Sequence, residues 1–121
     1  MDIFEPKKEY DLEERTYLFA KHVRFMVKQL PKTISNIEDS KQLVRASGSV
    51  GANYIEANES LSKKDFVMRV KISRKEAKES RYWLRLLDTN EQQELESKRS
   101  ALIQEATELM NIFGAILAKT K

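Results

Sequence analysis

Basic residues gather on one side of the segment 63–87, and phosphate binding is the chemistry that their spacing could support. Residues 63–85 hold nine Lys and Arg against three Asp and Glu, whereas the rest of the chain holds 13 and 16. An α-helix turns about 100° per residue, so eight of the nine cations fall within an arc of about 120°. This basic face comprises Lys63, Lys64, Lys71, Arg74, Lys75, Lys78, Arg81 and Arg85. A helix face of one charge sign is typical of proteins that bind the phosphate backbone of RNA or DNA.

The basic face has a plainer interpretation, which is that any exposed helix face is charged for solubility. A solvated face normally mixes the two signs in pairs four residues apart, and this one does not. We therefore expect nucleic-acid contacts from Lys64, Lys71, Arg74, Lys75, Lys78, Arg81 and Arg85. Tyr82 is the one aromatic residue in the arc, which favours backbone-directed binding with little sequence preference. The alternative is an interaction scaffold whose basic face meets an acidic protein surface.

Catalytic and metal-binding residues are scarce in this sequence. There is no Cys, which excludes disulfides, thiolate metal sites and cysteine nucleophiles, and the one His, His22, belongs to no catalytic motif. The candidate ligands of a Mg²⁺ site are Glu56, Glu59, Glu76 and Glu79. Pairing of these carboxylates with Arg45, with lysines or with Asn53 is the interpretation that we favour. We therefore expect no enzyme, no cofactor and no metal.

Apolar residues repeat with the period of an α-helix in four segments. The first covers about 11–30 and ends before Pro31, and the second covers about 40–58 with Asp39 as the expected N-cap. The third covers 62–87 and opens on Ser62 and Asp65, and the fourth follows residues 88–90. Four helices with short connections predict an all-α, up-down-up-down antiparallel four-helix bundle over residues 11–121. Residues 1–10, which contain Pro6, are expected to form an extended N-terminal arm.

The composition fits one helical domain. The chain has 121 residues, a formal charge of +3 and an isoelectric point near 9.1. Three Gly and two Pro are too few for a fold of many short strands. No secretory signal and no run of 18 apolar residues stands in the sequence, so we expect a cytoplasmic protein of bacterial type with no membrane contact.

Small residues interrupt the second helical segment. Ser47 and Gly51, and Gly48 and Ala52, are spaced four apart, although each interior Gly costs a helix about 0.5–1 kcal/mol relative to Ala. A phosphate cradle is disfavoured because "GSVG" lacks the following Lys-Ser/Thr and a preceding strand. A loop is disfavoured because the apolar period runs through the segment. We expect another helix to approach closely here, from the same chain or from another.

A second surface of the third segment combines apolar and acidic residues. Its members lie outside the expected core row, and they are Ile72, Glu76, Glu79, Trp83 and Leu86. Exposed Trp and Ile beside carboxylates favour a surface that meets another subunit. The first and fourth segments also carry second apolar stripes, so we expect a homo-oligomer.

Two stretches, "SVGANYIEA" at 49–57 and "FVMRVKISRKEAKESRYWLRLL" at 66–87, resemble the four-helix bundle proteins encoded in intervening sequences of bacterial large-subunit rRNA genes. This family, often labelled a ribosomal protein, is related to the accessory variability proteins of diversity-generating retroelements. The resemblance covers about residues 11–118. Its most specific positions are Ser49, Asn53, Glu56, Glu76, Glu79, Trp83 and Leu84.

The resemblance implies a homopentameric barrel with a basic surface. The retroelement relatives bind nucleic acid and partner a reverse transcriptase, whereas the plain members, which this chain resembles more, have no settled function. The ribosomal label does not establish a place in the ribosome. Together with the small-residue and apolar–acidic surfaces, the resemblance marks a set of residues expected in helix packing or in subunit contacts. These are Ser47, Gly48, Gly51, Asn53, Glu56, Ile72, Glu76, Glu79 and Trp83.

Overall fold

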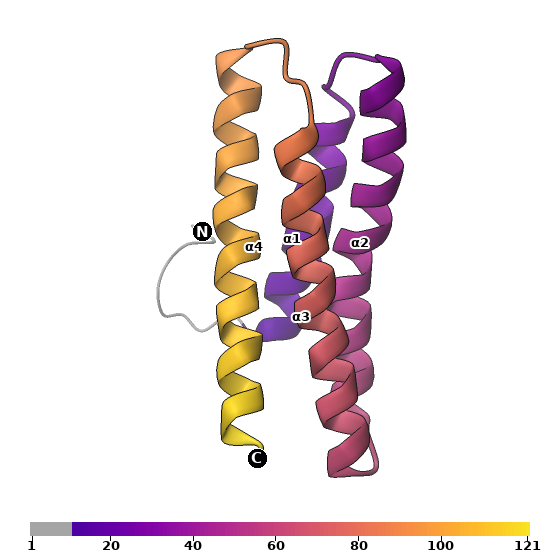
Figure 1. Ribbon diagram of the computed structural model, residues 1–121, viewed down its shortest axis with the longest axis vertical. Coiled ribbons are helices and arrows are strands. Elements are labelled where there is room, and N and C mark those ends of the chain that lie inside the picture. The colour runs from indigo at the N-terminus through magenta and orange to yellow at the C-terminus, as the bar shows by residue number, and fades with distance from the viewer. Residues whose placement is uncertain (1–10) are drawn as a thin grey trace.

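Four helices account for nearly all of the part of the chain that the computed structural model describes, residues 11–121 (Figure 1). They are α1 (Leu12–Val27), α2 (Ile34–Asn58), α3 (Lys63–Leu86) and α4 (Gln93–Lys119). The predicted N-terminal arm, residues 1–10, lies outside the described residues. Three helices have 24 to 27 residues, whereas α1 has 16.

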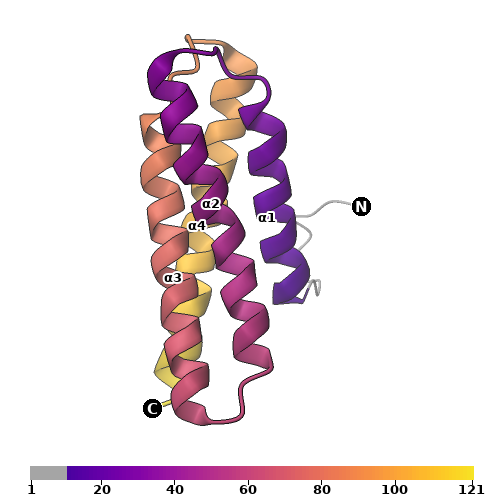
Figure 2. The same cartoon turned by 90° about the vertical axis from the view of Figure 1, so that its right-hand side faces the viewer.

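The helices follow one another up and down. Each packs against the next in sequence, and α1 also packs against α4, which closes the bundle (Figures 1 and 2). The connections 28–33 and 87–92 lie at one end of the bundle, and the connection 59–62 lies at the other. The predicted all-α class and four-helix arrangement are confirmed, and they place α3 between α2 and α4.

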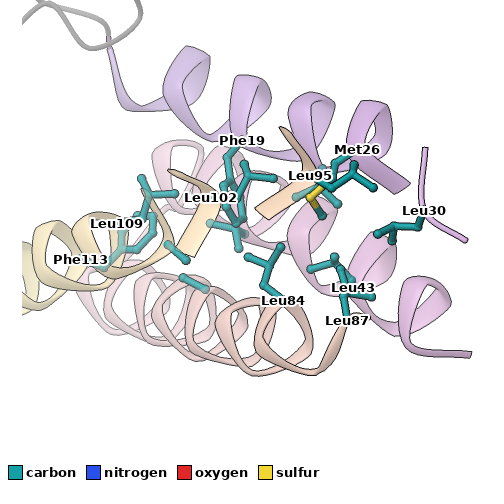
Figure 3. Close-up of a cluster of buried hydrophobic side chains, with 14 of the residues drawn as sticks. Phe19, Met26, Leu30, Leu43, Leu84, Leu87, Leu95, Leu102, Leu109 and Phe113 are labelled. Atoms are coloured by element: carbon teal, nitrogen blue, oxygen red, sulfur yellow. The ribbon is translucent and has the colours of Figure 1, made fainter. Parts of the chain in front are cut away.

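The core runs along the axis of the bundle and takes side chains from all four helices (Figure 3). The largest fully buried apolar side chains are Phe19, Met26, Leu43, Leu84, Leu109 and Phe113. Each of these side chains points inward from its helix, as the apolar repeat with the period of an α-helix leads one to expect. Phe66, near the start of α3, is only partly buried at the edge of this core.

The start of α2 corrects the sequence prediction. Its N-cap is Thr33, whose side chain accepts a hydrogen bond from Asn36 N at 3.1 Å, and Asp39 lies inside the helix. The helix therefore begins six residues before the predicted start. The apolar pattern concealed these turns because Ile34 is 85% exposed while the polar Asn36 takes the inward position. Likewise α1 ends at Val27, and Leu30 is buried in the turn that follows rather than in the helix.

Asn36 joins the two connections at that end of the bundle. Its Nδ2 donates to Pro31 O at 3.0 Å and to Asp88 O at 2.8 Å, and its Oδ1 accepts from Asp88 N at 2.9 Å. The side chain is 2% exposed, so these bonds satisfy it without water. The N-terminus of α2 is thereby fixed against the end of α3.

By length and composition alone, α4 is the one helix within residues 11–121 that could cross a membrane. In this fold it contributes Leu95, Leu102, Leu109 and Phe113 to the core and carries the buried carboxylate of Glu105. A core helix of a water-soluble bundle meets the same criterion.

Candidate nucleic-acid interface

The basic face lies along α3, which begins where the Ser62 side chain accepts a hydrogen bond from Asp65 N at 3.1 Å. Seven of its eight side chains are exposed, and Arg81 is partly buried. None of the eight forms an ion pair with another described residue. The helix therefore presents cations over more than five turns to the solvent.

Two arginines of the basic face contact α4. The guanidinium of Arg74 lies over Gly114, where an added Cβ would be 3.7 Å from Arg74 Cζ. Arg81 donates from Nη1 to Thr107 Oγ1 at 3.2 Å. The lysines at 71, 75 and 78 have no hydrogen-bond partner among the described residues, so the face combines two positioned arginines with longer, freely rotating lysines.

Two of the three carboxylates of α3, those of Glu76 and Glu79, are held on the opposite side, against α2. Arg45 Nη2 donates to Glu76 Oε1 at 3.1 Å and to Glu79 Oε2 at 2.9 Å. Trp83 Nε1 donates to the same Glu79 oxygen at 3.1 Å. Glu76 is only 7% exposed, so its charge is compensated inside the protein rather than by water. Arg45 thus draws the acidic groups of α3 away from the basic face.

These contacts shift the acid–base behaviour of the group around Arg45. The indole N–H of Trp83 lowers the pKa of Glu79 below its usual value, and the hydrogen bond and positive charge of Arg45 lower it further. The same carboxylates, Glu76 first and then Glu79, raise the pKa of Arg45. Glu79 and Arg45 are therefore ionised at neutral pH, which keeps their ion pair intact.

No magnesium site forms from the four glutamates. Glu76 and Glu79 are paired with Arg45, as the favoured interpretation expected. Glu56 and Glu59 are exposed and lie nearer the 59–62 connection. The hydrogen bond from Arg69 to Asn53 shows which parts of the antiparallel helices α2 and α3 are level, and Glu76 and Glu79 lie farther from that connection. Between residues 11 and 121 no group of three His, Cys, Asp or Glu is placed to hold a metal ion.

The small residues of α2 lie against α1 of the same chain. An added Cβ on Gly51 would be 2.7 Å from Thr16 Oγ1, and one on Gly48 would be 3.3 Å from Arg24 Nη2. Ser47 is fully buried and donates to Val44 O of its own helix at 3.2 Å. Close helix approach at this stretch is therefore intramolecular, and it needs no neighbouring subunit.

The other residues expected in subunit contacts are divided between the inside and the outside of the chain. Asn53 Oδ1 accepts from Arg69 Nη1 at 3.0 Å, so Arg69, the one cation of residues 63–85 outside the basic arc, is engaged by α2. Glu56 is exposed, and Ile72 and Trp83 are partly buried. The ring of Trp83 meets that of Tyr82 edge to face, with centroids 5.0 Å apart.

A contact between α1 and α4 escaped the sequence analysis. Arg15 donates to Glu105 at 2.7 and 2.9 Å and to Glu108 at 2.7 Å, across 90 and 93 residues of chain. Beside it a mainly apolar groove of about 300 Å³ opens between the two helices, lined by Leu18, His22, Phe25 and Ala101 among others. Long-range ion pairs of this kind leave no local signal in sequence, since their partners are set by tertiary packing.

The fold and the surface define a class: an α-helical bundle of four helices with its basic and acidic side chains segregated on α3. A family model described as 23S rRNA-intervening sequence protein matches residues 8–115, so the chain belongs to the 23S rRNA-intervening sequence protein family. The predicted membership is confirmed.

A solved structure agrees with this assignment. The crystal structure of a protein with unknown function from the S23 ribosomal protein family of Bacteroides thetaiotaomicron VPI-5482 is similar over 87% of this chain and 96% of that one. The TM-score is 0.72 and the sequence identity is 29%. No curated protein matches the chain.

Proposed function

We propose that this protein is a non-enzymatic, oligomeric nucleic-acid-binding protein that holds the phosphate backbone of RNA or DNA on the basic face of α3. The observation that carries the proposal is the separation of charge on this helix. Its cations have no carboxylate partner among the described residues, while Arg45 engages Glu76 and Glu79 on the other side. Unpaired cations along one face release counterions when they meet a polyphosphate, which favours binding.

The decisive experiment compares two variants: one loses four cations of the basic face, and the other loses four cations from elsewhere on the protein. The test variant changes Lys71, Lys75, Lys78 and Arg85 to Gln, all of which are exposed. The control changes the exposed Lys21, Lys28, Lys32 and Lys119 to Gln, so both variants lose the same formal charge. Binding to labelled 20-residue RNA and DNA strands is followed by fluorescence anisotropy between about 50 and 200 mM salt.

We expect the test variant to bind far more weakly and to lose about 0.7–0.9 from the log–log salt slope for each phosphate contact removed. The control should bind nearly as the wild type does. Equal weakening of both variants would mean that net charge, and not this face, is responsible. If the wild type binds neither strand at low salt, the proposal is wrong, and an acidic protein surface becomes the partner to seek.

We also propose that the protein is a homo-oligomer, for which family resemblance implies five subunits. Two surfaces with exposed apolar side chains support this: the α1–α4 groove with the 49%-exposed Phe25, and the side of α3 where the partly buried Ile72 and Trp83 and the exposed Leu86 lie beside the Arg45 ion pairs. A twofold contact would pair one such surface with itself and leave the other uncovered. Head-to-tail contact would cover both in every subunit of a ring, provided that the rotation between neighbouring subunits closes.

A further inference from the structure

A shallow groove runs between α3 and α4, next to the basic face. It has a volume of about 440 Å³ and is lined by Lys71, Arg74, Lys75, Lys78, Met110 and Leu117. We call it the α3–α4 groove. A second hollow of about 330 Å³ continues it toward the C-terminus, and Lys71, Leu117 and Gly114 line that part. The groove thus combines a cationic wall from α3 with a floor from α4.

The floor of the α3–α4 groove carries no charge. Residues 110–118 of α4 include no Asp, Glu, Lys or Arg, and Met110 and Leu117 are only partly buried against the core. Gly114 keeps the floor low, since any side chain there would extend beneath the guanidinium of Arg74. A simple phosphate-backbone site needs only cations, so a cationic wall beside an apolar floor best fits a ligand that also exposes an apolar surface.

We infer that the α3–α4 groove takes single-stranded nucleic acid, with phosphates on the lysines of α3 and unstacked bases against Met110 and Leu117. The inference rests on the proposed function and names its substrate class. A duplex keeps its base faces stacked inside and offers only phosphates and groove edges, so it gains nothing from the floor. A single strand presents both of the chemistries that line the groove.

The test compares three ligands on the wild-type protein at one salt concentration. They are a labelled 12-residue DNA strand, a strand of the same length whose internal residues are abasic, and a 12-base-pair duplex. We expect the abasic strand and the duplex each to bind about tenfold more weakly than the strand with bases, because they lack accessible base faces. Equal binding of the first two ligands would overturn the inference and leave phosphate-backbone binding intact. Absence of binding to all three would instead overturn the proposed function.

Gly114→Leu blocks the floor without changing any charge, and Gly114→Ala is its matched control. The Ala Cβ would make only ordinary contact with Arg74, at 3.7 Å, whereas the larger Leu fills the hollow. We expect Gly114→Leu to abolish the preference for the strand with bases, to retain duplex binding, and to keep its salt slope. Gly114→Ala should keep the preference. If Gly114→Leu does not give a helical circular dichroism spectrum, Met110→Gln serves as the test variant instead. An unchanged preference for the strand with bases, in whichever of these variants is folded, contradicts the inference.

Discussion

Gly51 of α2 and Thr16 of α1 are packed so closely that a methyl group on Gly51 would lie 2.7 Å from the Thr16 hydroxyl oxygen. Real Cβ atoms do not approach other heavy atoms so closely. Thr16 is fully buried, and its hydroxyl donates to Glu13 O at 3.0 Å, so it has little freedom to move aside. This pair sets the distance between α1 and α2.

The Gly51–Thr16 contact predicts a specific rescue. Gly51→Ala should lower the free energy of unfolding by about 1–2 kcal/mol, because overpacking outweighs the gain of about 0.5–1 kcal/mol in helix propensity. Thr16→Ala removes the hydroxyl and should recover part of that loss in the double variant, whereas Thr16→Val keeps a group in the same place and should not. Urea unfolding of the variants measures this coupling. Additive effects of Gly51→Ala and Thr16→Ala would refute close packing at this pair.

The hydrogen bonds of Asn36 predict that the loss of this one polar side chain lowers the stability of the protein substantially. Asn36→Ala should destabilise the protein by about 1–3 kcal/mol, since it leaves the partly buried backbone groups of Pro31 and Asp88 without their partners. Asn111, an exposed asparagine on α4, is the matched control and should change stability by less than about 0.5 kcal/mol. Thermal unfolding followed by circular dichroism distinguishes the two. Similar melting temperatures for both variants would show that the two connections are held by other contacts.

Glu79 predicts a loss of stability in acid. Its pKa is lower in the folded protein than its usual value, because the ionised carboxylate accepts from Trp83 and Arg45. The resulting stabilisation is present at pH values above the ordinary glutamate pKa of about 4.3 and is lost as the pH falls through the lowered folded value. Glu79→Gln should therefore reduce stability at neutral pH and flatten the acid limb of the stability curve.

Unfolding in urea between about pH 3 and pH 7 measures that curve. Glu59→Gln, which changes an exposed carboxylate at the end of α2, is the control, and its acid limb should match that of the wild type. Trp83 is the single tryptophan, so its fluorescence reports the same transition locally. An acid limb of equal slope in wild type and Glu79→Gln would contradict the assignment.

The α1–α4 groove predicts the state of assembly. Light scattering should give a native mass several times 14.1 kDa, with a fivefold mass expected for a pentamer. Phe25→Glu places a charge in the apolar groove and should reduce the mass to that of one chain while the helical spectrum persists. Ile55→Glu is the matched control, because Ile55 is exposed to a similar degree, 46%, on a different helix. A monomeric wild-type protein at micromolar concentration would refute the proposed oligomer.

The fold was predictable because each helix repeats its apolar residues with one period, and burial follows that period. The start of α2 could not be predicted in this way, because the polar Asn36 lies in an inward position and the apolar Ile34 lies in an outward one. The basic face was visible because its cations lie on a single helix. The sequence analysis named Arg45 as one of several partners for the glutamates of α2 and α3. The contacts of Arg15 with Glu105 and Glu108 could not be predicted, because they depend on how α1 and α4 pack.

The pairing of two carboxylates, Glu76 and Glu79, with the single arginine Arg45 affects the electrostatic field around α3. One guanidinium offsets one of the two charges of Glu76 and Glu79, so this group of three side chains keeps one negative charge, while the basic face of α3 carries eight cations without a carboxylate partner. The basic face is therefore the more positive side of α3. The field of an approaching polyanion would turn the molecule before contact, so that its positive side arrives first. Removing Glu76 and Glu79 would weaken this steering and slow the association rate at low ionic strength, although neither residue lies on the basic face.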